Sequence, residues 1–436
     1  MRPINVGLLG LGTVGGGTFE VLARNSEEIA RRAGRAIRIC AVADRNLERA
    51  REKVGDSVRV TDDVFSIVND PEIDIVVELI GGCDVAKELI LGAIANGKHV
   101  VTANKALLAL HGNEIFAAAQ ERGVMVAFEA AVAGGIPIIK ALREGLSANR
   151  IEWFAGIING TTNFILSEMR EKGLAFADVL HEAQMLGYAE ADPTFDVEGV
   201  DAAHKAALMS AIAFGVPMQF EAAHIEGITN LQSIDIAYAG QLGYRIKPLA
   251  LSSRRPEGVE LRVHPTLIPR DRLLANVEGP MNAVLVQGDA VGPTMYYGAG
   301  AGAEPTASAV IADLVDVTRL HTADPEHRVP HLAFQPDLLH DVKVLPIEEV
   351  ITSYYLRMRV DDKPGVLAEV TGILAQRSIS IEAMLQRQAE VGESRTDIII
   401  LTHRTVERNV NAAIKSIEAL PVVRGEVARL RMENLK

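Results

Sequence analysis

Three glycines near the start of the chain, Gly10, Gly12 and Gly15, lie between an apolar run and a helical pattern. The run Ile4–Leu9 predicts a buried strand, and the residues after the turn predict a helix that continues to about Arg24. Gly10 permits a tight turn, Gly12 lets a pyrophosphate approach the backbone, and Gly15 lets the helix pack closely on the strand. The helix N-terminus offers free N–H groups to phosphate. The turn therefore predicts a dinucleotide site with contacts from Gly10, Gly12, Thr13, Val14 and Gly15.

Four more short apolar runs follow at helix-length intervals: Ile37–Ala43, Ile73–Ile80, His99–Thr102 and Val124–Phe128. Short strands that are apolar on both faces and separated by helices predict a parallel sheet covered on both sides. After about Asn149 the segments become longer and alternate in polarity, and residues 254–258 predict a hairpin. The expected fold class is therefore α/β, with a Rossmann-type doubly wound domain followed by an α+β domain.

The second predicted strand ends at Asp44, which is followed by Arg45. An acidic residue at this place suits the ribose hydroxyls of NAD, whereas Arg45, with Lys53 nearby, suits the 2′-phosphate of NADP. The alternative interpretation of Asp44 is a cap for the helix predicted over Leu47–Val54. The sequence predicts NAD(P) binding through Asp44 and Arg45 and leaves the choice between the two cofactors open.

The charge balance and the cysteines narrow the class of protein. With 44 basic and 57 acidic residues the formal net charge is −13, which is the wrong sign for nucleic acid or an anionic membrane surface. Cys40 and Cys83 are too few for a disulfide framework and indicate a reducing compartment. The longest apolar stretch, 124–139, is interrupted by a carboxylate, two glycines and a proline and falls short of the ~20 residues of a membrane helix. We expect a soluble, cytoplasmic protein without nucleic-acid or membrane partners.

Residues 321–350 predict a linker between domains. The stretch from His321 to Pro346 carries four prolines and little periodicity. Its four histidines have spacings of 6, 4 and 9, which match no common zinc pattern, so we expect a solvated connection and not a metal site. These histidines are His321, His327, His331 and His340.

The last 86 residues, 351–436, predict the order strand, helix, strand, strand, helix, strand. This order is that of the ferredoxin-like fold. The segments are Ser353–Asp361, Pro364–Gln376, Ile379–Gln388, Thr396–His403, Val406–Leu420 and Val422–Arg431.

Five carboxylates lie within the twelve residues from Glu190 to Asp201, and Lys205 follows four positions later. Asp201 and Lys205 share one face of a predicted helix whose other positions are mostly apolar. The plainer interpretation is a solvated acidic loop, and a Ca²⁺ site is disfavoured because the spacing is not that of an EF-hand. A lysine buried beside a carboxylate is suited to proton exchange at a shifted pKa.

The run from Ala183 to Lys205 resembles the signature of the homoserine dehydrogenase family. The resemblance continues in GLLGLGTVG at 7–15, VVTANKALLA at 100–109, FEAAVAGGIPII at 128–139, NGTTNFIL at 159–166 and GAGAGAEPTASAV at 298–310. Residues 351–436 resemble an ACT domain, with Val360–Leu367 as its first strand-to-helix turn. The resemblance implies reversible reduction of L-aspartate 4-semialdehyde to L-homoserine with NAD(P)H, a step toward threonine and methionine.

The resemblance also implies roles for individual residues. Lys205 would be the proton donor, oriented by Asp201, and Lys105 would bind substrate near the nicotinamide. Glu190 and Asp196 would bind the substrate ammonium group, with Gly187 and Thr161 nearby as further substrate contacts. Two plainer interpretations stay open: a turn formed by Asp192, and a threonine helix cap in the segment 159–162.

Two further sites come from the resemblance alone. A monovalent cation such as Na⁺ would be held by oxygens of Glu129, Val132, Gly134 and Ile136, mostly from the backbone. The glycine-rich segment before the predicted helix 303–320 would return to the cofactor near the nicotinamide, through Gly302 and Glu304. The resulting domains are an NAD(P)-binding domain at 1–130, completed by helix 303–320, a substrate-binding and dimerisation domain at 131–302, the linker at 321–350 and the ACT domain at 351–436.

ACT domains commonly bind amino acids, so we expect feedback inhibition by threonine through Asp361, Gly365 and Val366, in a homodimer or homotetramer. The alternative is an ACT domain that serves only assembly. A chain truncated before Ile351 is expected to keep activity and lose inhibition. Two other functions are compatible with parts of the sequence: another NAD(P)-linked amino-acid or semialdehyde oxidoreductase, and a non-catalytic amino-acid sensor with a nucleotide-binding domain.

Overall fold

The computed structural model describes residues 2–321, 323–324, 328–387 and 393–436. Six parallel strands form the first sheet, in the order β3-β2-β1-β4-β5-β6. They are β1 (Ile4–Leu9), β2 (Ile37–Ala43), β3 (Arg59–Thr61), β4 (Ile75–Glu78), β5 (His99–Thr102) and β6 (Val126–Ala127). The order reverses at β1, next to β4, and this is where doubly wound folds bind dinucleotides. The predicted doubly wound domain is confirmed.

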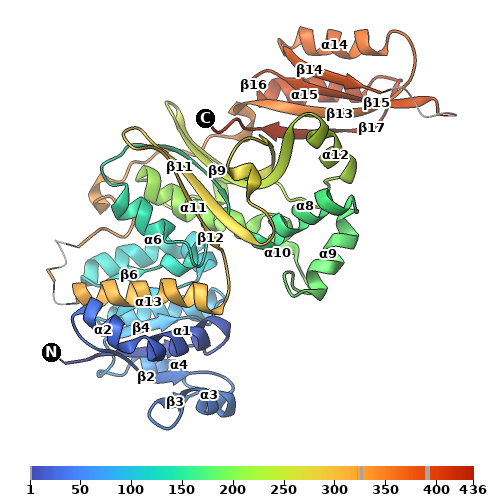
Figure 1. The fold of residues 1–436 in the computed structure, drawn as a ribbon. Helices are drawn as coiled ribbons and strands as arrows, with labels where there is room; N and C mark the ends of the chain where they lie inside the picture. The colour runs from blue at the N-terminus through green and yellow to red at the C-terminus, as the bar shows by residue number, and fades with distance from the viewer. Residues whose placement is uncertain (1, 322, 325–327, 388–392) are drawn as a thin grey trace.

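Helices cover both faces of this sheet (Figure 1). One apolar core lies under α1 (Thr13–Arg24) and α13 (Ala303–Leu320), and a second lies under α5 (Asp84–Ala95) and α6 (Lys105–Arg122). The smaller helices are α2 (Ser26–Ala33), α3 (Leu47–Val54) and α4 (Val64–Val68). Helix α13 thus packs beside α1 although it comes from far along the chain.

The second sheet spans the rest of the molecule. Its main path is β12-β11-β7-β9-β10-β17-β13-β15-β14, and β8 and β16 pair with β10 and β13 off this path. The strands before residue 300 are β7 (Ile151–Ile157), β8 (His224–Ile225), β9 (Tyr244–Arg255), β10 (Gly258–Pro269), β11 (Met281–Gly288) and β12 (Gly292–Ala299). The helices of this part are α7 (Ile138–Lys140), α8 (Gly160–Lys172), α9 (Phe176–Met185), α10 (Thr194–Val197), α11 (Val200–Phe214) and α12 (Ser233–Gln241). Arg255 pairs with Gly258, which confirms the predicted hairpin.

The C-terminal part has the predicted ferredoxin-like order. Its strands are β13 (Ile351–Asp361), β14 (Ile381–Gln386), β15 (Arg395–Thr402), β16 (Thr405–Val406) and β17 (Val423–Met432), and its helices are α14 (Val366–Gln376) and α15 (Glu407–Glu418). The strand order β17-β13-β15-β14 is that of a split βαβ unit. Gln388, the predicted end of one strand, lies outside the described residues.

The C-terminal part is continuous with the substrate domain. The expected result of truncation before Ile351 assumed that the two parts are structurally independent, and this assumption is wrong. Strand β17 continues the sheet of the substrate domain, because Thr266 pairs with Arg431 and Leu267 with Met432. One apolar core also contains residues of both parts, including Tyr355, Leu267 and Met432. Removing residues from Ile351 onward therefore exposes a core, so activity of the remainder is not expected.

The connection at 321–350 is irregular but not solvated throughout, so that expectation is wrong in part. His331 and Leu332 are 7% and 6% exposed. His331 Nε2 accepts a hydrogen bond of 3.1 Å from the backbone N–H of Val126, at the edge of the first sheet. Within the described residues no cluster of three or more metal-ligating His, Cys, Asp or Glu side chains is found. His327 lies outside the described residues.

We expect the free energy of unfolding to fall as the pH drops from 6.5 to 4, because two buried histidines must stay neutral. Burial, with Arg143 and Arg328 nearby, lowers the pKa of His331 to about 4, and burial lowers that of His99 to about 3. Both pKa values lie below the unfolded value, so the stabilisation is complete above pH 6.5 and is lost as the pH falls. Each of the two histidines lowers the free energy of unfolding by roughly 2 kcal/mol when the pH falls from 6.5 to 4.5.

Urea unfolding at pH 6.5 and 4.5 checks this expectation. His331→Gln keeps an acceptor for Val126 but cannot protonate, so its pH dependence should be smaller than that of the wild type. The exposed His181→Gln is the matched control and should show the wild-type dependence. Equal slopes in all three proteins would contradict the assignment.

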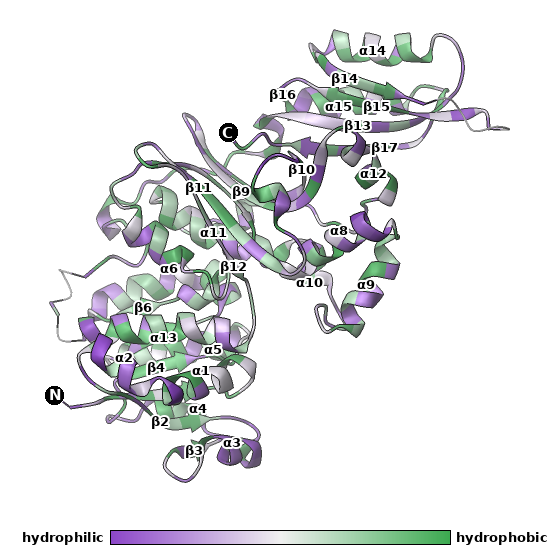
Figure 2. Ribbon diagram, viewed as in Figure 1, coloured by the Kyte–Doolittle hydropathy of each residue, from purple (hydrophilic) through white to green (hydrophobic). Residues whose placement is uncertain are grey.

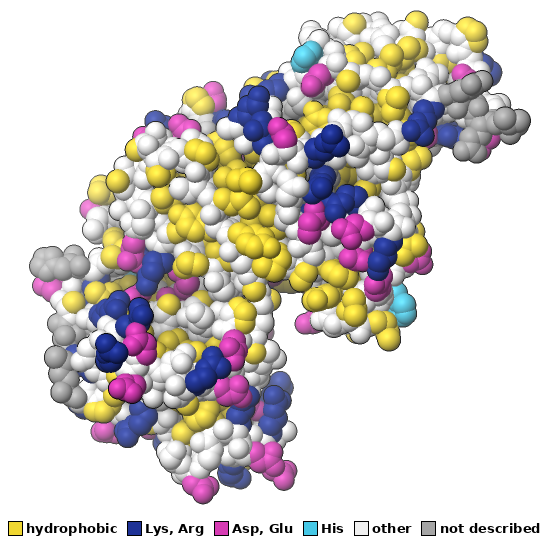
Figure 3. Space-filling model, viewed as in Figure 1, with side chains coloured by type: hydrophobic (Ala, Val, Ile, Leu, Met, Phe, Trp, Pro, Cys, Tyr) yellow, Lys and Arg dark blue, Asp and Glu magenta, His cyan; other side chains and the backbone are white. Residues whose placement is uncertain are grey.

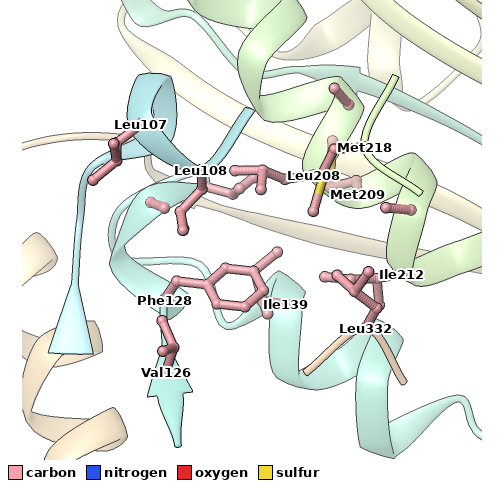
Figure 4. Packing of buried hydrophobic residues seen from close by; sticks show 14 of the residues in the cluster. Leu107, Leu108, Val126, Phe128, Ile139, Leu208, Met209, Ile212, Met218 and Leu332 are labelled. Carbon is pink, nitrogen blue, oxygen red and sulfur yellow. The ribbon is translucent and has the colours of Figure 1, made fainter. Parts of the chain in front are cut away.

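Helices α6 and α11 join the cofactor domain to the substrate domain. Figure 4 shows Leu108 of α6 directed toward Leu208 of α11, with Phe128 beneath them in the same core. Lys105 and Lys205 each lie three residues earlier, one turn away on the same side of their helices. The packing of the two leucines therefore brings the two lysines toward each other.

In the hydropathy colouring the inner strands of the first sheet are mostly green, and the outer helices α2 and α3 are mostly purple (Figure 2). Helix α11 is apolar almost all round, and its residues from Asp201 to Phe214 are buried, as predicted. Among the described residues, no helix has the length and apolar character needed to cross a membrane.

Candidate active site

The glycine-rich turn has the predicted geometry. Gly10 has φ of 92°, and a Cβ there would lie 2.8 Å from the carbonyl oxygen of Leu79. A Cβ on Gly15 would lie 2.0 Å from the carbonyl oxygen of Gly10, whereas the space around Gly12 is open within 4 Å. Gly12 precedes α1 without a side-chain cap. The exposed first turn of α1 is thus open to a phosphate group.

Asp44 holds the turn from the end of β2. Its Oδ2 accepts a hydrogen bond of 2.8 Å from the backbone N–H of Leu11, and its Oδ1 accepts one of 2.9 Å from Asn46 N. The cap of α3 is Asn46, whose side chain accepts from Arg49 N, so the interpretation of Asp44 as that cap is wrong. Arg45 is exposed beside it.

Two basic residues lie along α1: Lys53 near the turn, at Gly16, and Arg24 at the C-terminal end of the helix. Lys53 forms an ion pair of 2.7 Å with Glu20, and its Nζ lies against Gly16. Arg24 pairs with both carboxylate oxygens of Glu304, at 2.8 and 3.0 Å. Glu304 follows Gly302, whose φ is 127°, at the start of α13. Glu304 therefore contacts the C-terminal end of α1, and the neighbouring Ala303 lies against Gly17.

The catalytic candidates form one cluster. Lys205 Nζ donates hydrogen bonds to Asp201 Oδ2 at 2.7 Å and to the carbonyl oxygen of Ile158 at 2.8 Å. Lys105 Nζ lies 3.2 Å from the other oxygen, Asp201 Oδ1. The side chains of Asp201 and Lys205 are 5% and 11% exposed, and that of Lys105 is 34% exposed. Lys105 is thus the member of the cluster that faces solvent.

Burial and the two ammonium groups shift the pKa values within this cluster. Burial lowers the pKa of Lys205, the Asp201 carboxylate raises it in part, and Lys105 lowers it further, so that the net direction is downward. Burial by itself raises the pKa of Asp201, but Lys205 and Lys105 hold that carboxyl well below its usual range. The cluster therefore combines an ionised carboxylate with a lysine that releases its proton more readily than an exposed lysine.

The segment 159–162 contains a residue whose role the sequence pattern did not reveal. Asn159, not a threonine, caps α8, because its Oδ1 accepts from Thr162 N at 2.9 Å. Its Nδ2 donates to Asp196 Oδ1 at 2.7 Å and to Asp201 Oδ2 at 2.8 Å. The Asn–Gly pair at 159–160, which is typical of a turn, was the signal in the sequence. Asn159 thus brings Asp196 beside the cluster.

The remaining substrate candidates lie in the first turn of α8 and on the loop after α9. Thr161 Oγ1 donates to the carbonyl oxygen of Tyr188 at 2.6 Å, and Gly187 has φ of 76° in the same loop. Glu190 is exposed. Asp192 accepts from Thr194 N at 3.1 Å, which supports the turn interpretation. The loop therefore carries Glu190 at the surface next to the half-buried Asp196.

The predicted cation turn packs against the segment before α13. Glu129 uses its carboxylate to accept hydrogen bonds from Ile139 N at 2.9 Å and Lys140 N at 2.8 Å. Burial and the neighbouring Asp313 raise the pKa of Glu129 to about 7. Gly134 has φ of 44°, and a Cβ there would lie 2.5 Å from the carbonyl oxygen of Gly300. The carbonyl oxygen of Gly300, an oxygen of the kind that suits a hard cation, therefore lies against this turn.

The effector candidates lie at the start of the ACT domain. Asp361 pairs with Arg424 at 2.9 Å and with Lys363 at 3.1 Å. The hydrogen bonds from Arg424 and Lys363 lower the pKa of its carboxyl. Gly365 has φ of 95° and precedes α14, whose first residue, Val366, is buried. The three candidates therefore do share one turn.

A parallel sheet with an open glycine-rich turn at its switch point, and a buried lysine–aspartate cluster in the adjoining domain, define a dinucleotide-linked oxidoreductase. Family models agree with this class. The model of the homoserine dehydrogenase NAD-binding domain matches residues 10–129, that of homoserine dehydrogenase matches 137–315, and that of the ACT domain matches 354–422. The chain belongs to the homoserine dehydrogenase family.

Individual relatives match over the full length. Homoserine dehydrogenase of Pseudomonas aeruginosa is 63% identical over 436 residues, with complete coverage of both chains. The crystal structure of a homoserine dehydrogenase from Thiobacillus denitrificans is 69% identical, with a TM-score of 0.96, over 100% of this chain and 99% of that one. A hyperthermophilic archaeal homoserine dehydrogenase in complex with NADPH is 28% identical, with a TM-score of 0.63, over 73% of this chain and 98% of that one.

Proposed function

We propose that this chain catalyses the reversible NAD(P)H-dependent reduction of L-aspartate 4-semialdehyde to L-homoserine, in the biosynthesis of threonine and methionine. The observation that carries the proposal is the buried Asp201–Lys205 pair with Lys105 beside it. Reduction of an aldehyde needs a proton for the developing alkoxide, and a lysine with a lowered pKa supplies it. Bound NAD(P)H supplies the hydride.

In the reducing direction Lys205 gives its proton to the carbonyl oxygen, and in the oxidising direction the neutral amine takes it back. Asp201 stays ionised and keeps the ammonium group aimed along one direction. Lys105 binds the substrate beside it and adds positive charge where the alkoxide develops. A general acid of this kind contributes roughly 10²–10⁴-fold to the rate.

The substrate also carries an ammonium group, for which we assign Glu190 and Asp196. Glu190 is exposed on the loop after α9, and Asp196 lies beside the catalytic cluster. Charge-assisted hydrogen bonds to these carboxylates stabilise the bound substrate by roughly 1.5–3 kcal/mol each. Thr161 and Gly187 shape the same loop.

The cofactor would be held by the turn from Gly10 to Gly15, with Asp44 and Arg45 at the adenosine ribose and Gly302 and Glu304 near the nicotinamide. Asp44 supports NAD, because its carboxylate lies at the end of β2, where Oδ2 accepts from Leu11 N of the glycine-rich turn. Arg45 supports NADP. The nearby Lys53 already pairs with Glu20, so the weight of the contacts favours NAD.

A monovalent cation such as Na⁺ would fit at the turn formed by Glu129, Val132, Gly134 and Ile136. The Glu129 carboxylate accepts hydrogen bonds from α7, so the ligands would come mainly from backbone carbonyls. The turn contacts Gly300, close to the start of α13. Such a cation would stabilise the junction of the two domains.

We also propose feedback inhibition by threonine at Asp361, Gly365 and Val366, in a homodimer or homotetramer. The positive charges of Arg424 and Lys363 at this turn suit the carboxylate of an amino acid. Apolar side chains gather on the open face over β11 and β12 (Figure 3), where Tyr297 is 58% exposed. This face supports assembly through the substrate domain. The two free cysteines support a cytoplasmic location.

We expect the full-length chain to oxidise homoserine with NAD⁺ and NADP⁺, with no preference for NADP⁺ above tenfold. Initial rates of homoserine oxidation are measured with each cofactor. Each measurement is repeated with and without threonine, and in a sodium salt or in the salt of a large organic cation. Threonine should inhibit and leucine, the control amino acid, should not. A stronger preference for NADP⁺ would refute ribose binding by Asp44, and no oxidation at all would favour the non-catalytic sensor.

A further inference from the structure

The two residues that follow β7, Ile158 and Asn159, contact both members of the catalytic pair, Lys205 and Asp201. The carbonyl oxygen of Ile158 accepts a hydrogen bond of 2.8 Å from Lys205 Nζ. The side-chain amide of the next residue, Asn159, donates to Asp201 Oδ2 at 2.8 Å and to Asp196 Oδ1 at 2.7 Å. Two consecutive residues therefore hold the lysine and its carboxylate partner.

The start of α8 determines how the Asn159 amide is oriented. Its Oδ1 accepts from Thr162 N at 2.9 Å and from the Thr162 hydroxyl at 3.0 Å, so Nδ2 is the end that faces the carboxylates. The residue is 5% exposed. At the next position, Gly160, a Cβ would lie 2.7 Å from the carbonyl oxygen of Pro280. The close approach on one side and the cap on the other leave the amide little freedom to turn.

We propose that Asn159 is a positioning residue for the proton transfer at Lys205. This inference rests on the function proposed above. The two N–H donors of one amide serve two carboxylates, so Asn159 keeps Asp201 turned toward Lys205 and holds Asp196 beside it without adding charge. Loss of the amide leaves two largely buried carboxylates each short of a hydrogen bond, and both then compete for Lys205.

The charged groups that face Lys205 determine what a substitution at 159 does. They are Asp201, Lys105 and Asp196, with His204 adjacent in the chain and coupled to the same charges. Burial lowers the pKa of Lys205, and the carboxylates raise it. A third carboxylate at 159 would raise it further, so the amine would become neutral only at higher pH.

The variants Asn159→Ser and Asn159→Asp, each in the full-length chain, distinguish the two roles of Asn159. One role is to position the Asp201–Lys205 pair, and the other is to cap α8. Serine and aspartate both cap helices, so α8 keeps its N-cap in each variant. Homoserine oxidation needs the neutral amine, so the acidic limb of kcat follows the pKa of Lys205. We expect N159S to lower kcat by about 10–100-fold with an unchanged KM for the cofactor, and N159D to shift the limb upward by about one pH unit.

Asp63→Ala is the matched control, since Asp63 caps α4 in the same way at an exposed site away from the cluster. It should lower Tm slightly and leave the pH profile of kcat unchanged. A wild-type limb in N159D together with a kcat in N159S within threefold of wild type would overturn the inference. The inference would also be overturned if the losses in kcat followed the losses in Tm and the acidic limb of the kcat–pH profile did not shift. The role of Asn159 as the N-cap of α8 would then explain the effects. Failure of the proposed function is distinct, since the wild type itself would not oxidise homoserine.

Discussion

We expect Lys205→Ala to lower kcat by at least two orders of magnitude in both reaction directions, with little change in cofactor affinity. The reason is local: Lys205 is the one ammonium group bonded to both Asp201 and a backbone carbonyl, and burial lowers its pKa. Its removal leaves the developing alkoxide without a proton donor. Steady-state rates with both substrates, and cofactor titration followed by nicotinamide fluorescence, measure the two effects.

A second buried lysine provides the control for this substitution. Lys247 is 1% exposed, and burial lowers its pKa to about 8, but its partners are Val277 and Glu278, away from Asp201. Lys247→Met should therefore reduce Tm while kcat per folded molecule stays at the wild-type value. A Lys205→Ala enzyme that keeps more than a tenth of wild-type kcat rules out Lys205 as the proton donor.

Arg431→Met should lower the free energy of unfolding by up to about 3–5 kcal/mol, because the buried Glu407 carboxylate loses its closest cation and keeps only Arg429, at 3.2 Å, as a charged partner among the described residues. Arg431 is 1% exposed and joins Glu407 of the ACT domain to Glu226 of the substrate domain. Glu407 is itself 1% exposed. Urea unfolding followed by circular dichroism measures the loss, and a single transition should persist because the two parts share one sheet.

The double variant Arg431→Met, Glu407→Gln tests the cause. Removing the buried negative charge together with its partner should recover part of the stability. The exposed pair of Arg32 and Glu28 supplies the control, and Arg32→Ala should cost less than about 1 kcal/mol. Two separate unfolding transitions in the wild type, with Arg431→Met affecting only one of them, would contradict the shared sheet.

Local patterns in the sequence were sufficient for much of the fold. Strand Ile4–Leu9 and helix Leu47–Val54 have the predicted bounds, because each follows from apolar periodicity and a nearby turn. The pairing of Asp201 with Lys205 follows from their spacing of four on one helix. The approach of Lys105 came from the family resemblance, since its contact crosses from one domain to another.

Features that depend on packing between segments far apart in the sequence could not be predicted from local sequence patterns. In the sequence, Asn159 cannot be distinguished from other turn residues. Its role depends on α8, which orients its amide toward Asp196 and Asp201. The burial of His331 depends on an N–H of a strand two hundred residues earlier. The continuity of β10 with β17 depends on only two residue pairs, which carry no periodic signal. The roles of Glu190, the cation turn and the effector turn remain predictions.

The two-part cofactor domain has a consequence for synthesis of the chain. The ion pair of Arg24 with Glu304 joins residues 280 positions apart, and α13 completes the layer over α1. At about 5–20 residues per second, a ribosome needs on the order of 15–60 s to deliver α13 after α1. During that interval the apolar face beneath α13 stays uncovered. Efficient folding in the cell should therefore depend on chaperones that shield a nascent chain for that time.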